Sequence, residues 1–205
     1  AGLHGGFGPD LLPGYAWSFP LPDGRANVGF GVLRGGRVAV GDTGRVWDGL
    51  MERPAIRAVL GDTARPDGRR SAWPIPARVD AAVLDQGPVL FVGDAASATD
   101  ALTGEGIGQA LQTGILAAEA ALSGGTTVEV ATLYRRTARR ELVADHRMSV
   151  ALQGMLAWPT GARMALWVTG LAPWTRRNFA RWLFEDYPRA LLATPRRWRP
   201  GSLSA

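Results

Sequence analysis

Residues 89–106 combine a short apolar segment, an acidic turn and a glycine-rich loop, and this order constrains the fold more than any other part of the chain. The segment begins with Val-Leu-Phe-Val at 89–92, and Gly93 and Asp94 follow directly. A short apolar run is consistent with a buried strand, and open α/β sheets bind ligands at the carboxyl ends of their strands. The pattern therefore predicts that the Asp94 carboxylate points out of the sheet toward a bound molecule.

The loop after Asp94 contains Thr103, Gly104 and Gly106, and a long apolar, Ala-rich run follows it. The apolar spacing predicts a mostly buried helix over 104–122, which Gly124 and Gly125 would end. Backbone N–H groups at the start of a helix favour an anionic or electron-rich ligand. Together with Asp94, the loop predicts a ligand that combines a polyol with an anion. The alternative is an ordinary βα turn with a capping aspartate and two turn glycines.

A second motif lies near the start of the chain, where Tyr15, Trp17 and Phe19 alternate with small residues. A period of two puts the three rings on one face of a strand. The Pro-Asp-Gly turn at 22–24 and a returning strand over 26–32 complete a predicted hairpin. Gly29 and Gly31 lack side chains, so either a ring from the partner strand or a ligand can approach the backbone there. Alternatively, the rings are plain sheet core.

Both motifs resemble those of one known family. The first resembles the second flavin-contacting motif of FAD-dependent oxidoreductases with the para-hydroxybenzoate hydroxylase fold. The second is Tyr-x-Trp-x-Phe-Pro followed, after eight residues, by Gly-x-Gly. It is similar to the substrate-domain signature of geranylgeranyl reductases and the related menaquinone-reducing enzymes.

The resemblance implies an α/β chain that forms part of a two-domain FAD-binding fold. In this interpretation residues 1–80 are part of a substrate-binding sheet domain with short helices. Residues 81–125 are the second half of the FAD-binding domain, and residues 126–205 form a helical region with a basic tail. Ala101 stands where family members usually carry proline, so the loop is expected to be less rigid.

The resemblance also implies roles for individual residues. Asp94 would bind the ribityl chain of FAD, and the glycine loop would pass beneath the isoalloxazine ring. The cofactor contacts implied in this way are Gly93, Asp94, Ala95, Leu102, Thr103, Gly104, Glu105, Gly106 and Ile107. The implied pocket for a prenyl chain contains Tyr15, Trp17, Phe19, Pro20, Gly29, Gly31 and Trp73.

The implied activity is the reduction of an isoprenoid double bond by hydride transfer from reduced flavin. Two alternatives stay open: a flavin monooxygenase or halogenase of the same fold, against which the aromatic hairpin argues, and a non-catalytic lipid-binding remnant. No catalytic residue is identified. His4 in a predicted loop and His146 on an Arg-rich helix are interpreted as structural or solvent-facing. The chain has no Cys, and no metal site is predicted.

No strand in the chain is followed by Gly-x-Gly-x-x-Gly, the pattern that holds the ADP half of a dinucleotide. Family members carry that motif upstream of the segment that matches here. We therefore interpret the chain as the carboxyl-terminal half of a longer flavoprotein. The amino-terminal, nucleotide-binding half would be its partner, and we expect the fragment alone to be inactive.

The charge is unevenly distributed. Residues 1–134 carry 10 Arg and 14 acidic residues, a net of −4, whereas residues 135–205 carry 13 Arg and 4 acidic residues, a net of +9. Arginines interleaved with tryptophans favour contact with an anionic membrane surface or a diphosphate-bearing lipid, and a solvated helical face is the alternative. No nucleic-acid-binding module accompanies the charge, so no nucleic-acid partner is predicted.

No apolar run approaches the ~18–20 residues needed to cross a bilayer, and no signal peptide is recognised. The sequence thus predicts a cytoplasmic protein with at most peripheral membrane contact. The remaining elements expected from the sequence are two short helices over 44–60 broken at Pro54, an extended segment at 72–76, a long amphipathic helix over 128–155 and at least two Trp-containing helices after it.

Overall fold

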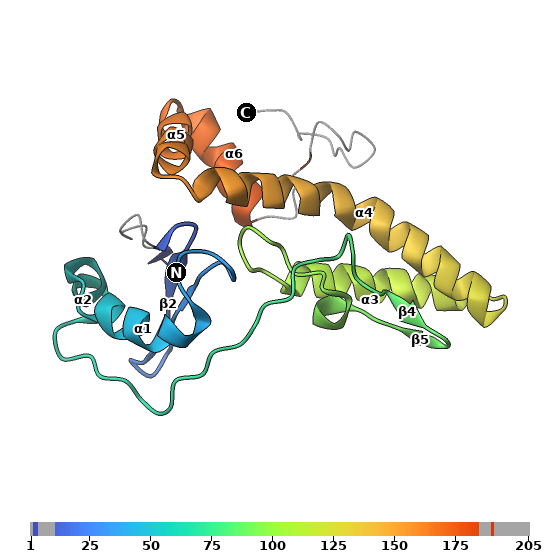
Figure 1. The fold of residues 1–205 in the computed structure, drawn as a ribbon, viewed down its shortest axis with the longest axis horizontal. Coiled ribbons are helices and arrows are strands. Elements are labelled where there is room, and N and C mark those ends of the chain that lie inside the picture. The colour runs from blue at the N-terminus through green and yellow to red at the C-terminus, as the bar shows by residue number, and fades with distance from the viewer. Residues whose placement is uncertain (1, 4–10, 185–189, 191–205) are drawn as a thin grey trace. The chain divides into compact units, whose positions relative to one another are not determined.

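The computed structural model describes residues 2–3, 11–184 and 190 (Figure 1). These residues form six α-helices and two small antiparallel sheets, which confirms the mixed α/β class. They fall into two compact units. The first contains the described residues up to Ala72 together with Met155–Arg163, and the second contains Trp73–Gly154 and the described residues from Met164 onward.

The first unit contains the predicted hairpin. Strand β2 (Tyr15–Pro20) pairs antiparallel with β3 (Ala26–Gly31), and β1 (Gly2–Leu3) pairs with the other edge of β2. The turn closes through a 2.7 Å hydrogen bond from the Leu21 N–H to the Arg25 carbonyl. Gly24 adopts a φ of +80° in this turn, a conformation that favours glycine.

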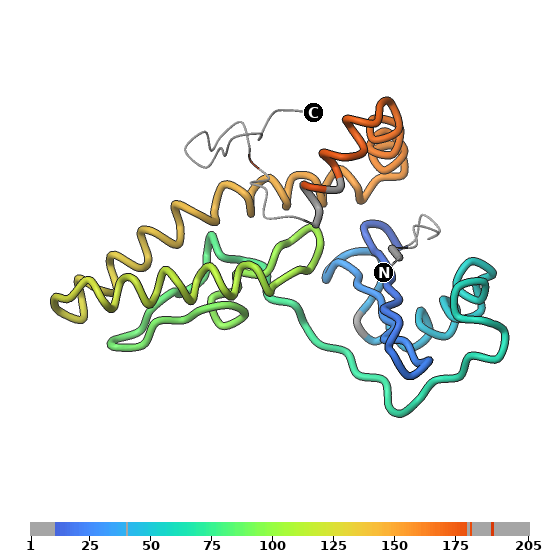
Figure 2. The backbone as a smooth tube through the Cα atoms, turned by 180° about the vertical axis from the view of Figure 1, so that it is seen from behind, coloured from blue at the N-terminus to red at the C-terminus, as the bar shows by residue number. Residues whose placement is uncertain are grey.

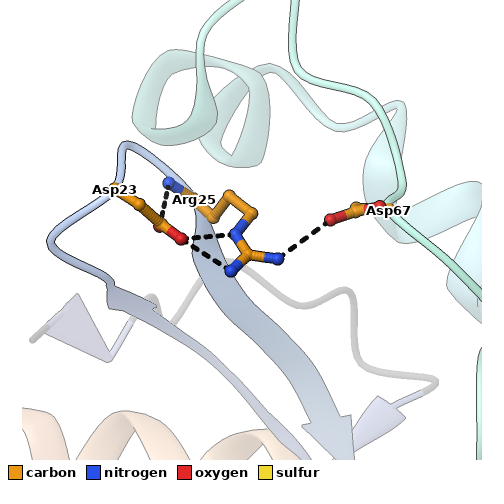
Figure 3. Close-up of polar contacts among 3 residues, drawn as sticks. All are labelled: Asp23, Arg25 and Asp67. Carbon is orange, nitrogen blue, oxygen red and sulfur yellow. Dashed lines mark hydrogen bonds and ion pairs between the residues drawn. The ribbon is translucent and has the colours of Figure 1, made fainter.

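Arg25 ties the hairpin turn to the loop that carries Asp67. Figure 3 shows its guanidinium between two carboxylates, with the Nε group donating to Asp23 Oδ2 at 2.7 Å and another nitrogen lying 3.2 Å from Asp67 Oδ2. The Arg25 side chain, and next its backbone N–H, hold the pKa of Asp23 below its ordinary value. These groups are exposed, so the contacts order the turn more than they stabilise the fold.

The two short helices predicted over 44–60 are present, and they pack against one face of the hairpin. Helix α1 (Thr43–Met51) follows the 3-10 turn η2 (Val40–Asp42), and α2 (Pro54–Leu60) begins at a proline, whose missing N–H costs nothing in the first turn. The core of this unit contains Ala16, Leu50 and Ile56, with Phe30 packed against them. Because Ala16 faces this core, the rings of Tyr15, Trp17 and Phe19 belong to the opposite face of β2. In the described structure these rings are not part of the core that contains Ala16.

The predicted extended segment at 72–76 forms no strand. Pro74 and Pro76 cannot donate backbone hydrogen bonds, which disfavours pairing in a sheet. The first pairing after them is an isolated bridge between Ala77 and Ala98. Trp73 is 88% exposed in this segment.

The second unit is built on two long helices. Helices α3 (Ile107–Leu122) and α4 (Thr127–Leu156) lie close together near the turn that joins them and diverge from there in both views (Figures 1 and 2), and a small ribbon of β4 (Asp85–Gln86) and β5 (Val89–Leu90) lies beside α3. Their shared core consists of Val79, Leu84, Ala96, Ala98, Ala120, Tyr134, Ala138 and Leu142. Tyr134 is fully buried, and its hydroxyl donates to the Phe91 carbonyl at 2.5 Å.

Two predictions about this unit need correction. The apolar run 89–92 forms only the two-residue strand β5, which pairs antiparallel with β4, and Val89 and Val92 are exposed rather than buried. Helix α3 is not mostly buried either, because Leu111 and Ile115 lie on an exposed side. An apolar run shows that a segment can be buried, but the available neighbours decide whether it is. The predicted end of α3 is confirmed, since it stops before Gly124 and Gly125, with φ of +75° and +104°.

The long helix predicted over 128–155 is confirmed as α4. Two further helices follow, α5 (Pro159–Gly170) and α6 (Pro173–Phe184), and both contain tryptophan, as predicted. In the part of the chain that the structure describes, no helix combines the length and apolarity needed to cross a membrane.

We expect Tyr134→Phe to lower the free energy of unfolding by about 1 kcal/mol at neutral pH, because the Phe91 carbonyl loses its donor. Burial raises the pKa of Tyr134 above its ordinary value of 10.0. Above that pH the unfolded chain ionises first and binds fewer protons than the folded chain, so stability falls as pH rises. The Tyr134→Phe variant has no hydroxyl to ionise at this position and does not lose this stability. The difference in free energy of unfolding between the two proteins should therefore shrink from about pH 10 upward.

Urea unfolding followed by circular dichroism between pH 8 and pH 11 measures both effects. The other tyrosines are present in both proteins and cancel in the difference. A difference that stays constant over this range would contradict the expectation.

Candidate functional site

The turn that carries Asp94 is fixed by glycine. In the 3-10 turn η3 (Gly93–Ala96), Gly93 has a φ of +55°, and its N–H donates to the Thr113 hydroxyl of α3 at 2.9 Å. A Cβ at Gly93 would lie only 3.1 Å from the Ala110 side chain. Glycine therefore lets the turn pass directly over α3 and leaves the next side chain, Asp94, exposed.

The structure brings Asp94 and the glycine loop together. Asp94 Oδ1 accepts a hydrogen bond from the Thr99 hydroxyl at 2.9 Å. A Cβ added to Gly106 would lie 3.3 Å from that hydroxyl and 3.5 Å from Asp94 Oδ1. The carboxylate and the bare backbone of Gly106 thus form one small polar surface at the start of α3.

The loop before α3 is closed by its own backbone. The Gly104 N–H donates to the Asp100 carbonyl, and the Asp100 N–H donates to the Glu105 carbonyl, both at 2.9 Å. Gly104 has a φ of +70°. Glu105 Oε1 accepts the Ile107 N–H at 3.2 Å and thereby satisfies a backbone donor in the first turn of α3.

Asp100 anchors this loop, and the sequence analysis did not identify it. Its side chain is buried, and Oδ2 accepts both the N–H and the hydroxyl of Thr103 at 2.6 Å. Its other oxygen, Oδ1, accepts the hydroxyl of the buried Ser149 on α4, also at 2.6 Å. Gln153 on α4 donates to the Ala101 carbonyl at 2.6 Å.

The local part of this arrangement has a sequence signal. An Asp that accepts hydrogen bonds from residues just after it is a common turn element, and Asp100 precedes Thr103 at such a spacing. Ser149 and Gln153 carry no such signal, because they reach the loop from a helix far along the chain.

The other cofactor contacts expected from the sequence lie on the same segment. Leu102 and Thr103 are partly buried in the loop, whereas Ala95 and Ile107 are exposed. His4 lies outside the described residues. His146 is buried on α4, and its Nε2 lies 3.1 Å from Asp80 Oδ1, so it is not solvent-facing. The described residues contain no cluster of three or more His, Asp or Glu side chains that could hold a metal ion.

The aromatic hairpin in the first unit matches each glycine with a ring. Trp17 pairs with Gly29 and Tyr15 with Gly31. A Cβ at Gly29 would fall within the Trp17 ring, and one at Gly31 would lie 3.4 Å from the Tyr15 ring. At these positions the structure supports the first of the two explanations for the glycines, a ring from the partner strand.

The rings form a connected face. The Tyr15 and Trp17 centroids are 5.8 Å apart, and the Trp17 Nε1–H donates to Asn27 Oδ1 at 3.0 Å. Phe19 and Pro20 continue this strand and are exposed. Trp73, the remaining residue of the predicted substrate pocket, belongs to the second unit.

Comparison with curated proteins identifies relatives of the chain. It is 35% identical over 132 residues to the menaquinone reductase of Mycolicibacterium smegmatis, a match that covers 57% of this chain and 28% of the relative. It is 34% identical over 140 residues to the digeranylgeranylglycerophospholipid reductase of Methanothrix thermoacetophila, covering 66% of this chain and 34% of the relative. The chain is a homologue of proteins of the geranylgeranyl reductase family.

A third relative supports the same assignment. The menaquinone reductase of Mycobacterium tuberculosis is 36% identical over 121 residues, which are 53% of this chain and 26% of the relative. The resemblance inferred from the two motifs is thus confirmed, although the chain spans only about a quarter to a third of the length of these relatives. No family model and no solved structure matches the chain.

Two carboxylates of this site provide a matched pair for mutagenesis. Asp100→Asn should lower the free energy of unfolding by about 2–3 kcal/mol, because the amide puts a donor where the loop and Ser149 also donate. Asp94→Asn changes an exposed carboxylate, so its free energy of unfolding should stay within about 0.5 kcal/mol of the wild-type value. Urea unfolding of both variants tests this. Equal losses would show that Asp100 does not anchor the loop.

The two hairpin glycines form another pair. Gly29→Ala must displace the Trp17 ring and break its hydrogen bond to Asn27, so it should reduce the local stability of the hairpin by about 1–2 kcal/mol. In Gly31→Ala the added methyl group would make an ordinary contact with Tyr15, so the local stability of the hairpin should fall by less than about 0.5 kcal/mol. Amide hydrogen exchange over residues 15–31 reports this difference, and similar exchange in both variants would refute it.

Proposed function

We propose that this chain is part of an FAD-dependent oxidoreductase that reduces double bonds in prenyl lipids. The observation that carries the proposal is its similarity to reductases named for two different compounds, menaquinone and digeranylgeranylglycerophospholipid. These compounds have unlike head groups, and both carry prenyl chains. Relatives that differ in head group support a role for the shared segment in the common chemistry or in handling the common chain.

The polar surface around Asp94 suits the polyol part of a flavin. Its exposed carboxylate can accept hydrogen bonds from ribityl hydroxyl groups, while Thr99 holds one of its oxygens in place. Gly106 keeps the adjacent backbone bare, since a side chain there would crowd Thr99 and Asp94. In this proposal Gly93, Asp94 and Ala95, with the loop residues 102–107, contact FAD.

The start of α3 adds an electrostatic contribution. A helix amino terminus stabilises nearby negative charge by about 0.3–1 kcal/mol when exposed, so it would favour the reduced, anionic form of a ring placed beside Gly106. When bound, reduced flavin would supply the hydride for a carbon–carbon double bond. This chain's contribution would be to bind and orient the cofactor, through Asp94 and the loop that Asp100 anchors.

The aromatic face of the hairpin suits the prenyl chain. The rings of Tyr15, Trp17 and Phe19 lie on the face of β2 away from the core, where the glycines of β3 let them lie close to the backbone. An apolar surface of this kind can bury isoprene units at about 25 cal/mol per Å². We propose that these rings, with Pro20, line the substrate site, and that Trp73 contributes to it as well.

The whole reaction is proposed for a protein in which this segment works with a nucleotide-binding segment, since the chain spans about a third of its relatives. The division of the chain into a substrate-domain part (1–80), an FAD-domain part (81–125) and a helical region (126–205) belongs to the same proposal.

Titration of the chain with FAD, followed by flavin fluorescence, tests the cofactor site. We expect binding that Asp94→Ala weakens about tenfold or more, the loss expected for a hydrogen bond to a charged group. Glu119→Ala removes another exposed carboxylate, on α3 and away from the loop, and should leave the affinity unchanged.

Equal affinity of the wild-type chain and Asp94→Ala would contradict the assignment of Asp94. Tight binding of menaquinone by a folded chain that does not bind FAD would instead identify a lipid-binding module. Circular dichroism of each variant establishes that it is folded.

A further inference from the structure

Helices α5 and α6 are joined by a short connection, and several of their apolar side chains are exposed. Leu171 and Ala172 connect the two helices. The Ala172 N–H donates to the Thr175 hydroxyl at 3.0 Å, and this hydroxyl donates back to the Ala172 carbonyl at 2.7 Å. These bonds fix the connection, so the residues on either side of it have a defined orientation.

Several exposed apolar residues lie on one side of α5, just after its end, and at the first turn of α6. Met164, Trp167 and Leu171 recur at helical spacing and are 59%, 65% and 57% exposed. Trp174, the second residue of α6, is 48% exposed. We call the surface formed by Met164, Trp167, Val168, Leu171 and Trp174 the tip face.

A shallow cleft of about 260 Å³ opens beside the tip face. It is lined by Val168, Thr169, Trp174, Thr175, Asn178 and Phe179. Its volume is below the roughly 300–1,000 Å³ of pockets that enclose small-molecule ligands, so it does not suit a whole prenyl lipid. A cleft of this size is better suited to a surface that contacts an extended apolar environment.

The charged residues of α5 and α6 are all arginines. Residues 146–184 contain five Arg and no Asp or Glu. Arg176 and Arg177 lie in the first turns of α6, two and three residues after Trp174, and both are exposed. Exposed tryptophan and leucine next to unbalanced arginine is the pattern of helices that lie in the interface of an anionic membrane.

The lengths of α5 and α6 are consistent with helices that lie on a bilayer surface and do not cross it. Each of these helices has 12 residues, whereas about 20 are needed to span a bilayer. A protein partner would need acidic groups to meet Arg176 and Arg177 as well as an apolar surface. An anionic bilayer presents both features over its whole surface.

We propose that helices α5 and α6 dock on the surface of an anionic phospholipid bilayer. The tip face enters the boundary between head groups and acyl chains, and Arg176 and Arg177 contact the phosphate groups. This contact is independent of the reductase function proposed above, since it uses none of the residues assigned to cofactor or substrate.

Vesicle co-flotation of the 205-residue chain tests the proposal. We expect binding to vesicles of phosphatidylcholine with phosphatidylglycerol, and much weaker binding to phosphatidylcholine alone. Leu171→Ser should weaken binding about tenfold, because it removes a buried leucine side chain from the contact. Leu166→Ser is the matched control, since Leu166 is 73% exposed but lies roughly 200° around α5 from Met164.

The charge is tested separately. Arg176→Glu with Arg177→Glu should reduce binding to the anionic vesicles at least about tenfold, given about fivefold for each arginine near an anionic surface. Arg65→Glu with Arg69→Glu makes the same change in net charge at two exposed positions of a loop and should have little effect. Circular dichroism establishes that all variants are folded.

Three results would overturn the proposal. One is a folded wild-type chain that does not bind anionic vesicles, and another is an equal loss from Leu166→Ser and Leu171→Ser. The third is self-association in sedimentation experiments that Leu171→Ser abolishes, because the tip face would then be an interface between copies of the chain.

Discussion

The buried carboxylate of Asp100 is the interaction on which the candidate cofactor site depends. It joins the glycine loop to α4 by accepting hydrogen bonds from Thr103 and Ser149. A buried carboxylate is costly unless its oxygens find donors, so the loop conformation that supplies them is strongly favoured. That conformation places Gly106 beside Asp94, so Ser149 of α4 helps to position this surface through Asp100.

In both candidate sites a neighbouring group lies so close to the backbone that only glycine fits. Gly93 passes over Ala110 of α3, and Gly29 lies beneath the Trp17 ring. In each case a methyl group would displace the neighbour that shapes the site. The glycines thus bring a functional side chain close to a scaffold, in one case a carboxylate and in the other an aromatic ring. They also make both sites sensitive to small changes in packing.

Much of the local structure could be predicted from the sequence. The hairpin, the break at Pro54, the end of α3 and the long helix α4 all follow from periodicity and from turn residues, which act over a few positions. The strand at 89–92 and the burial of α3 were not predicted correctly. Both depend on neighbours elsewhere in the chain, and an apolar pattern does not say which neighbours are present.

The sequence by itself determined the family resemblance and the residue types of the two sites, because Gly-Asp, the glycine loop and the aromatic alternation are local patterns. Only the tertiary structure decided that Asp94 meets Gly106 and that Ser149 anchors Asp100. It also decided that the rings of the hairpin face away from the core and that the tip face of α5 and α6 is exposed. The physical reason is that hydrogen bonds and burial between distant segments depend on how helices and strands pack, which no local pattern specifies.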